Sequence, residues 1–145
     1  MRPFNWAGVV AAIIVAEALG FLWYGPLYGE RWAMLMGRPG ESVISSGNTD
    51  MAFGVIATAL WVCGLAWIAA RSGVSGWWAG ARMGGAAWLL FAMPLQSFAF
   101  TYAGRNDKLA PIELGYTLAA FVLSGALVAG LSLKARGELA ADDGF

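Results

Sequence analysis

The stretch FNWAGVVAAIIVAEALGFLWYGP, residues 4–26, decides the fold of this 145-residue chain. It is an almost unbroken apolar run with a single carboxylate, Glu17, inside it, and it closes on an aromatic pair, Trp23 and Tyr24. A helix that crosses a bilayer needs about 20 mostly apolar residues, and aromatic rings gather where such helices meet the lipid headgroups. The sequence therefore predicts a transmembrane helix over residues 4–24.

The stretch that follows, PLYGERWAMLMG, predicts a shorter helix over residues 26–36 that lies along the membrane surface. Its aromatic and apolar side chains recur at helical spacing, while Glu30 and Arg31 fall off that stripe, which is typical of an interfacial helix. We expect the turn between the two helices to be anchored at the interface by one motif: Gly20, Trp23, Tyr24, Pro26 and Trp32.

A cleavable signal peptide is the alternative interpretation of the first run, because Ala16-Glu17-Ala18 resembles a small-x-small cleavage site. Glu17 is a poor occupant of such a site, and the apolar run continues beyond it through Trp23. Both features favour a retained membrane helix.

Three further apolar stretches are long enough to cross a membrane, at residues 51–70, 77–102 and 112–133. The third is roughly 39 Å long at 1.5 Å per residue, so we expect it to tilt, or to bend at Pro94. Short connections between the later stretches predict antiparallel neighbours, and residues 134–145 read as a polar, frayed tail. The predicted fold is all-α: a single transmembrane domain of four spanning helices, with one interfacial helix after the first.

Composition excludes several classes of function. The chain is 59% hydrophobic and 12% charged, with a mean hydropathy of +0.63, whereas soluble domains carry about 25% charged residues. Nine basic and nine acidic residues cancel, which argues against a nucleic-acid partner. Because the chain has no histidine and one cysteine, Cys63, it offers no imidazole ligand and no histidine-activated nucleophile. We therefore expect no enzyme activity, no cofactor and no metal site.

Small residues recur every fourth position in two of the predicted spans. They are Gly8, Ala12, Ala16 and Gly20 in the first, and Gly76, Gly80 and Gly84 in the third. In lipid, faces of small residues let helix backbones approach closely, and this approach drives association. Such a face packs either inside one bundle or against a second copy. We expect intrachain packing for one face and a homo-oligomer through the other.

Glu17 is the starting point for any functional hypothesis. An ionised side chain deep in a span costs about 2.5–3.5 kcal/mol or more, and such residues usually face a bundle interior or a water path. Thr58 on the second span and Gln96 on the third are its expected partners at similar depth. Two interpretations remain open: a protonated, hydrogen-bonded Glu17 that locks helix register, or a role with a proton, ion or polar substrate.

Charged residues crowd the third connection and the start of the fourth helix, among them Arg105, Lys108 and Glu113. Glu113 falls in the first helical turn after Pro111, where the helix dipole favours a carboxylate. We expect an ion pair there that clamps the connection, and a lipid-headgroup site is the alternative.

Two motifs resemble a widespread bacterial family catalogued as domain of unknown function 1761. The first is ALGFLWYGPLYGERWAMLMG, residues 18–37, and the second is AGRNDKLAPIELGYTLAAFVLSGALVAG, residues 103–130. The matching positions near and within the second motif are Tyr102, Gly104, Arg105, Lys108, Leu109, Glu113, Gly115, Tyr116 and Gly125. The resemblance implies a small four-helix integral membrane protein and supplies no activity.

The sequence predicts a multi-pass protein in contact with the lipid bilayer, and the resemblance implies that this bilayer is the bacterial inner membrane. Five basic residues on one side against four on the other lean toward both termini in the cytoplasm. We expect a self-associating or accessory bundle that scaffolds itself or a larger membrane complex. The alternative is a minimal channel or transporter subunit for protons, ions or a small polar solute, lined by Glu17, Gln96 and Thr58. A lipid-modifying enzyme, with Glu30, Arg31, Arg105 and Glu113, ranks third.

Overall fold

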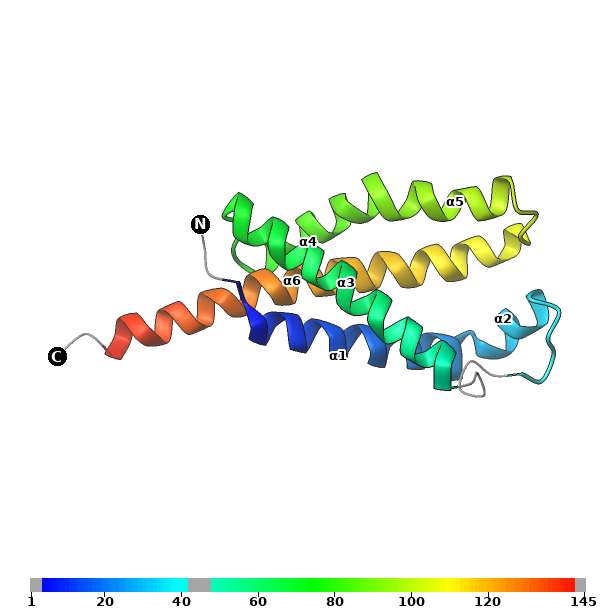
Figure 1. Cartoon of the computed structure of the whole chain (residues 1–145), viewed down its shortest axis with the longest axis horizontal. Coiled ribbons are helices and arrows are strands. Elements are labelled where there is room, and N and C mark those ends of the chain that lie inside the picture. The colour runs from blue at the N-terminus through cyan, green and yellow to red at the C-terminus, as the bar shows by residue number, and fades with distance from the viewer. Residues whose placement is uncertain (1–3, 42–47, 143–145) are drawn as a thin grey trace.

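A computed structural model describes residues 4–41 and 48–142, and the side chains of residues 4–41 and 49–131. Long helices run side by side, and α6 continues beyond the end of the bundle at which α1 begins (Figure 1). The elements are α1 (Trp6–Leu22), a π-helical turn (Trp23–Leu27), α2 (Gly29–Leu35), α3 (Asn48–Ser72), α4 (Trp77–Ala87), a second π-helical turn (Trp88–Ala92), α5 (Met93–Thr101), a 3-10 turn (Asp107–Leu109) and α6 (Ala110–Asp142). The predicted all-α fold is confirmed.

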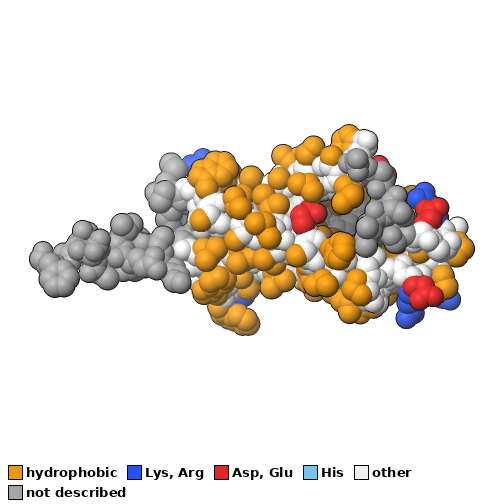
Figure 2. All heavy atoms as spheres, turned by 90° about the horizontal axis from the view of Figure 1, so that it is seen from below, with side chains coloured by type: hydrophobic (Ala, Val, Ile, Leu, Met, Phe, Trp, Pro, Cys, Tyr) orange, Lys and Arg blue, Asp and Glu red, His pale blue; other side chains and the backbone are white. Residues whose placement is uncertain are grey.

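Four of these helical segments are long and apolar enough to cross a membrane: Trp6–Leu27, Thr49–Ser72, Trp77–Thr101 and Asp107–Leu131. Large hydrophobic side chains point outward from them, including Leu60 at 70% exposure and Trp78 at 75%. Figure 2 shows hydrophobic side chains over the middle of one face and charged side chains gathered mainly toward one end, with acidic atoms visible inside the hydrophobic area. This surface suits lipid, where apolar side chains need no burial, and it marks a multi-pass membrane protein.

The first span ends in a π-helical turn, because its sequence cannot continue an α-helix. Pro26 lies inside the turn and has no backbone N–H to donate, and Gly25 adopts φ −101° and ψ −105°. The N–H of Tyr28 donates to the carbonyl of Trp23 at 2.8 Å, and this hydrogen bond closes the turn. The short helix then starts at Gly29, so the predicted boundary at residue 26 is wrong by three residues.

The third span also contains a π-helical turn, immediately before Pro94. Pro94 removes one backbone donor, and the widened turn at Trp88–Ala92 accommodates this loss before α5 starts at Met93. The predicted irregularity therefore lies over Trp88–Ala92, which ends two positions before Pro94, and the span consists of α4, the turn and α5.

Glycine contacts bring α4 and α6 together along their backbones. A Cβ at Gly84 would lie 2.8 Å from the carbonyl carbon of Phe121, and a Cβ at Gly80 would lie 2.9 Å from the carbonyl carbon of Gly125. Gly76, predicted to share this face, instead precedes α4 with φ +96° and donates its N–H to the carbonyl of Ala129 at 3.2 Å. It is a turn residue that fastens the start of α4 to α6.

The small residues of α1 are used inside the same bundle. Ala12 and Ala16 are buried at 0% and 1% exposure, Gly8 abuts the backbone of Val128, and Gly20 faces Tyr116. Both small-residue faces therefore have packing contacts within the chain, and self-association through one of them stays a prediction.

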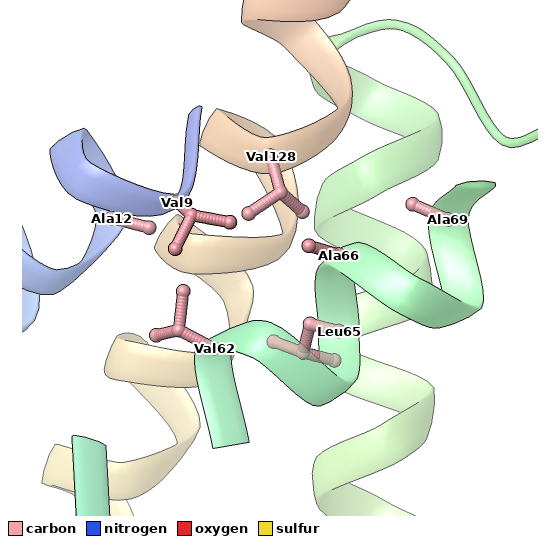
Figure 3. Packing of buried hydrophobic residues seen from close by; sticks show 7 residues of the cluster. All are labelled: Val9, Ala12, Val62, Leu65, Ala66, Ala69 and Val128. Carbon is pink, nitrogen blue, oxygen red and sulfur yellow. The ribbon is translucent and has the colours of Figure 1, made fainter. Parts of the chain in front are cut away.

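The core is a small cluster contributed by α1, α3 and α6. Figure 3 shows Val9 and Ala12 of α1 facing Val62 of α3 and Val128 of α6, with Leu65, Ala66 and Ala69 continuing along α3. Small and β-branched side chains suit this position, because they let three helices approach at one point.

Two helices extend beyond their predicted boundaries. The fourth helix runs to Asp142, because residues 134–142 are mostly Ala, Glu, Leu, Lys and Arg, which favour helix even where they are polar. The predicted frayed tail is therefore helical as far as Asp142, and residues 143–145 lie outside the described residues. The second span likewise extends beyond residues 51–70, to Asn48–Ser72.

Candidate functional site

A hollow of about 600 Å³ lies between α1 and α3 and reaches α6. Its polar groups are two carboxylates, Glu17 and Asp50, and the hydroxyls of Thr58, Tyr24 and Tyr116. The remaining lining is small or apolar: Ala18, Gly20, Phe21, Gly25, Met51, Gly54 and Val55. The structure thus brings Glu17 and Thr58 to one cavity, as expected for residues at similar depth.

Helical spacing explains why these residues share the hollow. Glu17, Gly20, Phe21 and Tyr24 stand at i, i+3, i+4 and i+7 along the end of the first span, so they occupy one helix face. Glycine creates the space, because a Cβ at Gly54 on the facing helix would have no atom within 4 Å.

The Glu17 carboxylate is partly buried and forms no hydrogen bond or ion pair with any residue that the structure describes. A register lock requires a hydrogen-bond partner on a neighbouring helix. Tyr116 of α6 is close enough to interact electrostatically with Glu17, but its hydroxyl donates to the carbonyl of Ala16 at 3.4 Å. The carboxylate instead faces an open cavity, where a proton, water or a bound cation can satisfy it.

A second hollow, of about 410 Å³, lies on the other side of a tyrosine pair. Tyr24 and Tyr116 line both cavities, and their rings meet edge-on with centroids 5.2 Å apart. The other residues around this second hollow are Trp32, Gln96, Ala99, Arg105, Glu113 and Thr117.

Gln96 belongs to the second hollow, so the predicted trio of Glu17, Gln96 and Thr58 is split. The Thr117 hydroxyl lies 3.2 Å from Oε1 of Gln96 and accepts a hydrogen bond from the Trp88 indole at 2.9 Å. Gln96 faces α6 because this relay holds it there, and the tyrosine pair separates it from Glu17.

An ion pair joins Arg105 to Glu113 at the rim of the second hollow. The same Glu113 oxygen accepts a hydrogen bond from the Trp32 indole at 3.2 Å, which ties α2 to the start of α6. Arg105 also contacts the sulfur of Met36 at 3.7 Å, and its Nε is buried without an acceptor among the described residues.

Lys108, predicted to share this clamp, is exposed, and its side chain makes no ion pair with a described residue. Its backbone N–H donates to the Asn106 side chain at 3.0 Å. The clamp therefore consists of Arg105, Glu113 and Trp32.

The predicted interfacial motif is used for contacts between helices. The Trp23 indole donates to the carbonyl of Ile112 at 2.9 Å, and Tyr24 packs edge-on against Trp32 with ring centroids 5.8 Å apart. Gly20 leaves room for the Tyr116 hydroxyl, which would lie 3.1 Å from a Cβ at this position.

Sequence reasoning missed several residues of these two hollows. The sequence predicted no place in a site for Asp50 and Thr117, and it marked Tyr116 only as a position that matches the family. Asn5 was also missed: its side chain caps α1 through the N–H of Gly8 and donates to the carbonyl of Val128, each at 3.1 Å. Asn5 before an apolar run is a usable cap signal, but nothing local indicates its partner 123 residues away.

The first hollow is lined by acidic and aromatic side chains. No Lys or Arg is among the described residues that line it, and the described part of the chain contains no group of three or more His, Cys, Asp or Glu that could hold a metal ion. The cavity can therefore attract a cation, but its carboxylates are too few for a protein-built metal cage.

A model of the family described as "Protein of unknown function (DUF1761)" matches residues 7–129. No curated protein and no solved structure matches the chain.

Proposed function

The chain belongs to the DUF1761 family, as its two motifs predicted, and we propose that this member of the family carries a small cationic solute or proton across the membrane. The observation that supports this proposal is the first hollow, a cavity within the apolar part of the bundle that holds the Glu17 carboxylate without a hydrogen-bond or ion-pair partner among the described residues. Intramembrane carboxylates of this kind usually serve ion pathways or proton relays.

The geometry favours a mechanism in which a proton and a cation exchange at the Glu17 carboxylate. An ionised carboxylate in a span costs about 2.5–3.5 kcal/mol or more, so Glu17 is most stable when a proton or a bound cation neutralises it. Because both neutralise the same group, binding of one releases the other. The tyrosine pair, Tyr24 and Tyr116, closes the hollow toward the second cavity and toward Arg105, whose charge would repel a cation.

Flux in liposomes tests the proposal. Protein reconstituted into phosphatidylcholine liposomes should release protons and monovalent cations faster than empty liposomes do, and Glu17→Gln should return the rate to that of empty liposomes. The matched control is Glu30→Gln, an exposed acid on α2 outside both hollows, which should keep the wild-type rate. Circular dichroism of each variant verifies that the bundle is folded. Equal flux in wild type and Glu17→Gln, or no flux above the empty-liposome rate, would overturn the proposal.

Self-association as an accessory bundle is a second candidate, and the outer face of α3 favours it. Phe53, Leu60 and Trp67 are exposed at seven-residue intervals, and Gly64 on the same face has no atom within 4 Å of a Cβ position. An exposed glycine in a span allows a second helix to approach closely.

Gly64→Leu tests this candidate without disturbing the monomer, because its side chain would enter open space. We expect the variant to shift the mass of the detergent-solubilised protein from oligomer to monomer, measured by light scattering. A leucine at Gly64 that leaves the mass unchanged would exclude this face as the contact.

A further inference from the structure

We infer that the ligand of the first hollow is an amphipathic organic cation, a drug-sized molecule with one positive centre and an apolar or aromatic body. This inference rests on the proposed cation function and narrows it to one class of solute. Three observations carry it: the size of the hollow, the nature of its walls and the placement of its two carboxylates.

The size of the hollow fits a molecule rather than a bare ion. Cavities that bind small molecules measure about 300–1,000 Å³, and this hollow measures about 600 Å³. A bare metal ion instead needs several oxygen, nitrogen or sulfur ligands converging at short distances. The described residues offer no such cluster, and a bare ion would leave most of the volume of the hollow unfilled.

The walls fit an apolar body with a positive centre. Phe21, Met51 and Val55 give the hollow apolar sides, and the rings of Tyr24 and Tyr116 close its α6 side. Aromatic faces attract organic cations through their π-electrons, most strongly where water is excluded. A strongly hydrated solute would gain little from such walls.

The two carboxylates mark two stages of binding along the hollow. Asp50 is exposed in the first turn of α3, and Thr58 is buried eight residues later, which is about 12 Å along the helix. α3 begins near the end of α1 and runs back along it (Figure 1). Because Asp50 lies in the first turn of α3 and Glu17 lies before the last turn of α1, Asp50 marks the outer part of the hollow and Glu17 the deeper part. Asp50 would attract a cation at the mouth, and Glu17 would hold its positive centre inside.

Binding in nanodiscs of phosphatidylcholine tests the inference with two probes of matched size and opposite charge, tetraphenylphosphonium and tetraphenylborate. We expect saturable binding of tetraphenylphosphonium above empty nanodiscs, loss of that binding in Glu17→Gln, and none for tetraphenylborate. Equal binding of both probes would overturn the inference, because an apolar cavity alone would explain it.

A pair of glycine variants on one helix separates the hollow from the rest of the surface. Gly54→Leu would fill the cavity, since a Cβ there meets no atom within 4 Å, whereas Gly64→Leu would enter open space outside it. We expect Gly54→Leu to weaken tetraphenylphosphonium binding about ten-fold or more and Gly64→Leu to leave it unchanged. Equal affinities in the two variants would place the probe elsewhere and overturn the inference.

The liposome assay distinguishes this inference from the proposed function. Proton and cation flux that depends on Glu17, without saturable tetraphenylphosphonium binding, would overturn the ligand class and leave the transport proposal standing. Absence of both flux and binding would overturn both.

Discussion

Gly84→Val is expected to destabilise the bundle by roughly 3 kcal/mol, or to abolish the folded protein. A Cβ at Gly84 would lie 2.8 Å from the carbonyl carbon of Phe121 and 3.3 Å from Cα of Val122. Both atoms belong to the backbone of α6, so no side-chain rotation relieves the overlap and the two helices must separate. The measurement is loss of helical circular dichroism on titration of the detergent-solubilised protein with sodium dodecyl sulfate.

Gly54→Val is the matched control, because it adds the same side chain to a glycine in another spanning helix that has no atom within 4 Å. We expect it to change the free energy of unfolding by less than about 0.5 kcal/mol. If the two variants unfold at the same detergent fraction, the close approach of α4 and α6 is not what stabilises the fold.

Glu113→Ala is expected to lower the free energy of unfolding by about 2 kcal/mol. The substitution removes the partner of Arg105 and the acceptor of the Trp32 indole together, and it leaves a guanidinium whose Nε is already buried without an acceptor among the described residues. The side chains of Arg105 and Glu113 are only 35% and 16% exposed, so water compensates the loss only in part. Glu113→Gln should cost about half as much, because its amide oxygen can still accept from Trp32.

Glu41→Ala provides the control for this second prediction. Its carboxylate lies 3.8 Å from Arg38, and the two side chains are 63% and 61% exposed. Exposed pairs of this kind contribute about 0–1 kcal/mol, so the variant should unfold close to wild type in the same titration. A similar loss in Glu41→Ala and Glu113→Ala would mean that the Arg105 clamp is no stronger than a surface ion pair.

The clamp and the first hollow are physically connected through Tyr24. Its ring packs edge-on against Trp32, which donates to Glu113, and against Tyr116, which lines both hollows. The contacts that hold α2 against α6 therefore also fix the wall between the two cavities. This arrangement gives the interfacial motif a role in shaping the candidate binding site.

Much of the fold was predictable from the sequence because a bilayer imposes one strong constraint. Backbone groups in hydrocarbon must be satisfied within the chain, so long apolar stretches of about 20 residues form helices. The four predicted spans correspond to four helices of the right length and apolarity. The motifs at residues 18–37 and 103–130 likewise predicted the family. Residue chemistry alone also marked Glu17 as unusual, since it is a lone acid in an apolar run.

The tertiary structure alone decided which residues meet. Asn5 reaches Val128, Trp23 reaches Ile112 and Trp32 reaches Glu113, at sequence separations of 123, 89 and 81 residues. Gln96 pairs with Thr117 rather than facing Glu17, and both small-residue faces pack inside the bundle. Helices that are apolar on every side have no hydrophobic face to direct their pairing in lipid. Their arrangement therefore depends on close backbone contacts and single hydrogen bonds between distant residues, which no local pattern in the sequence encodes.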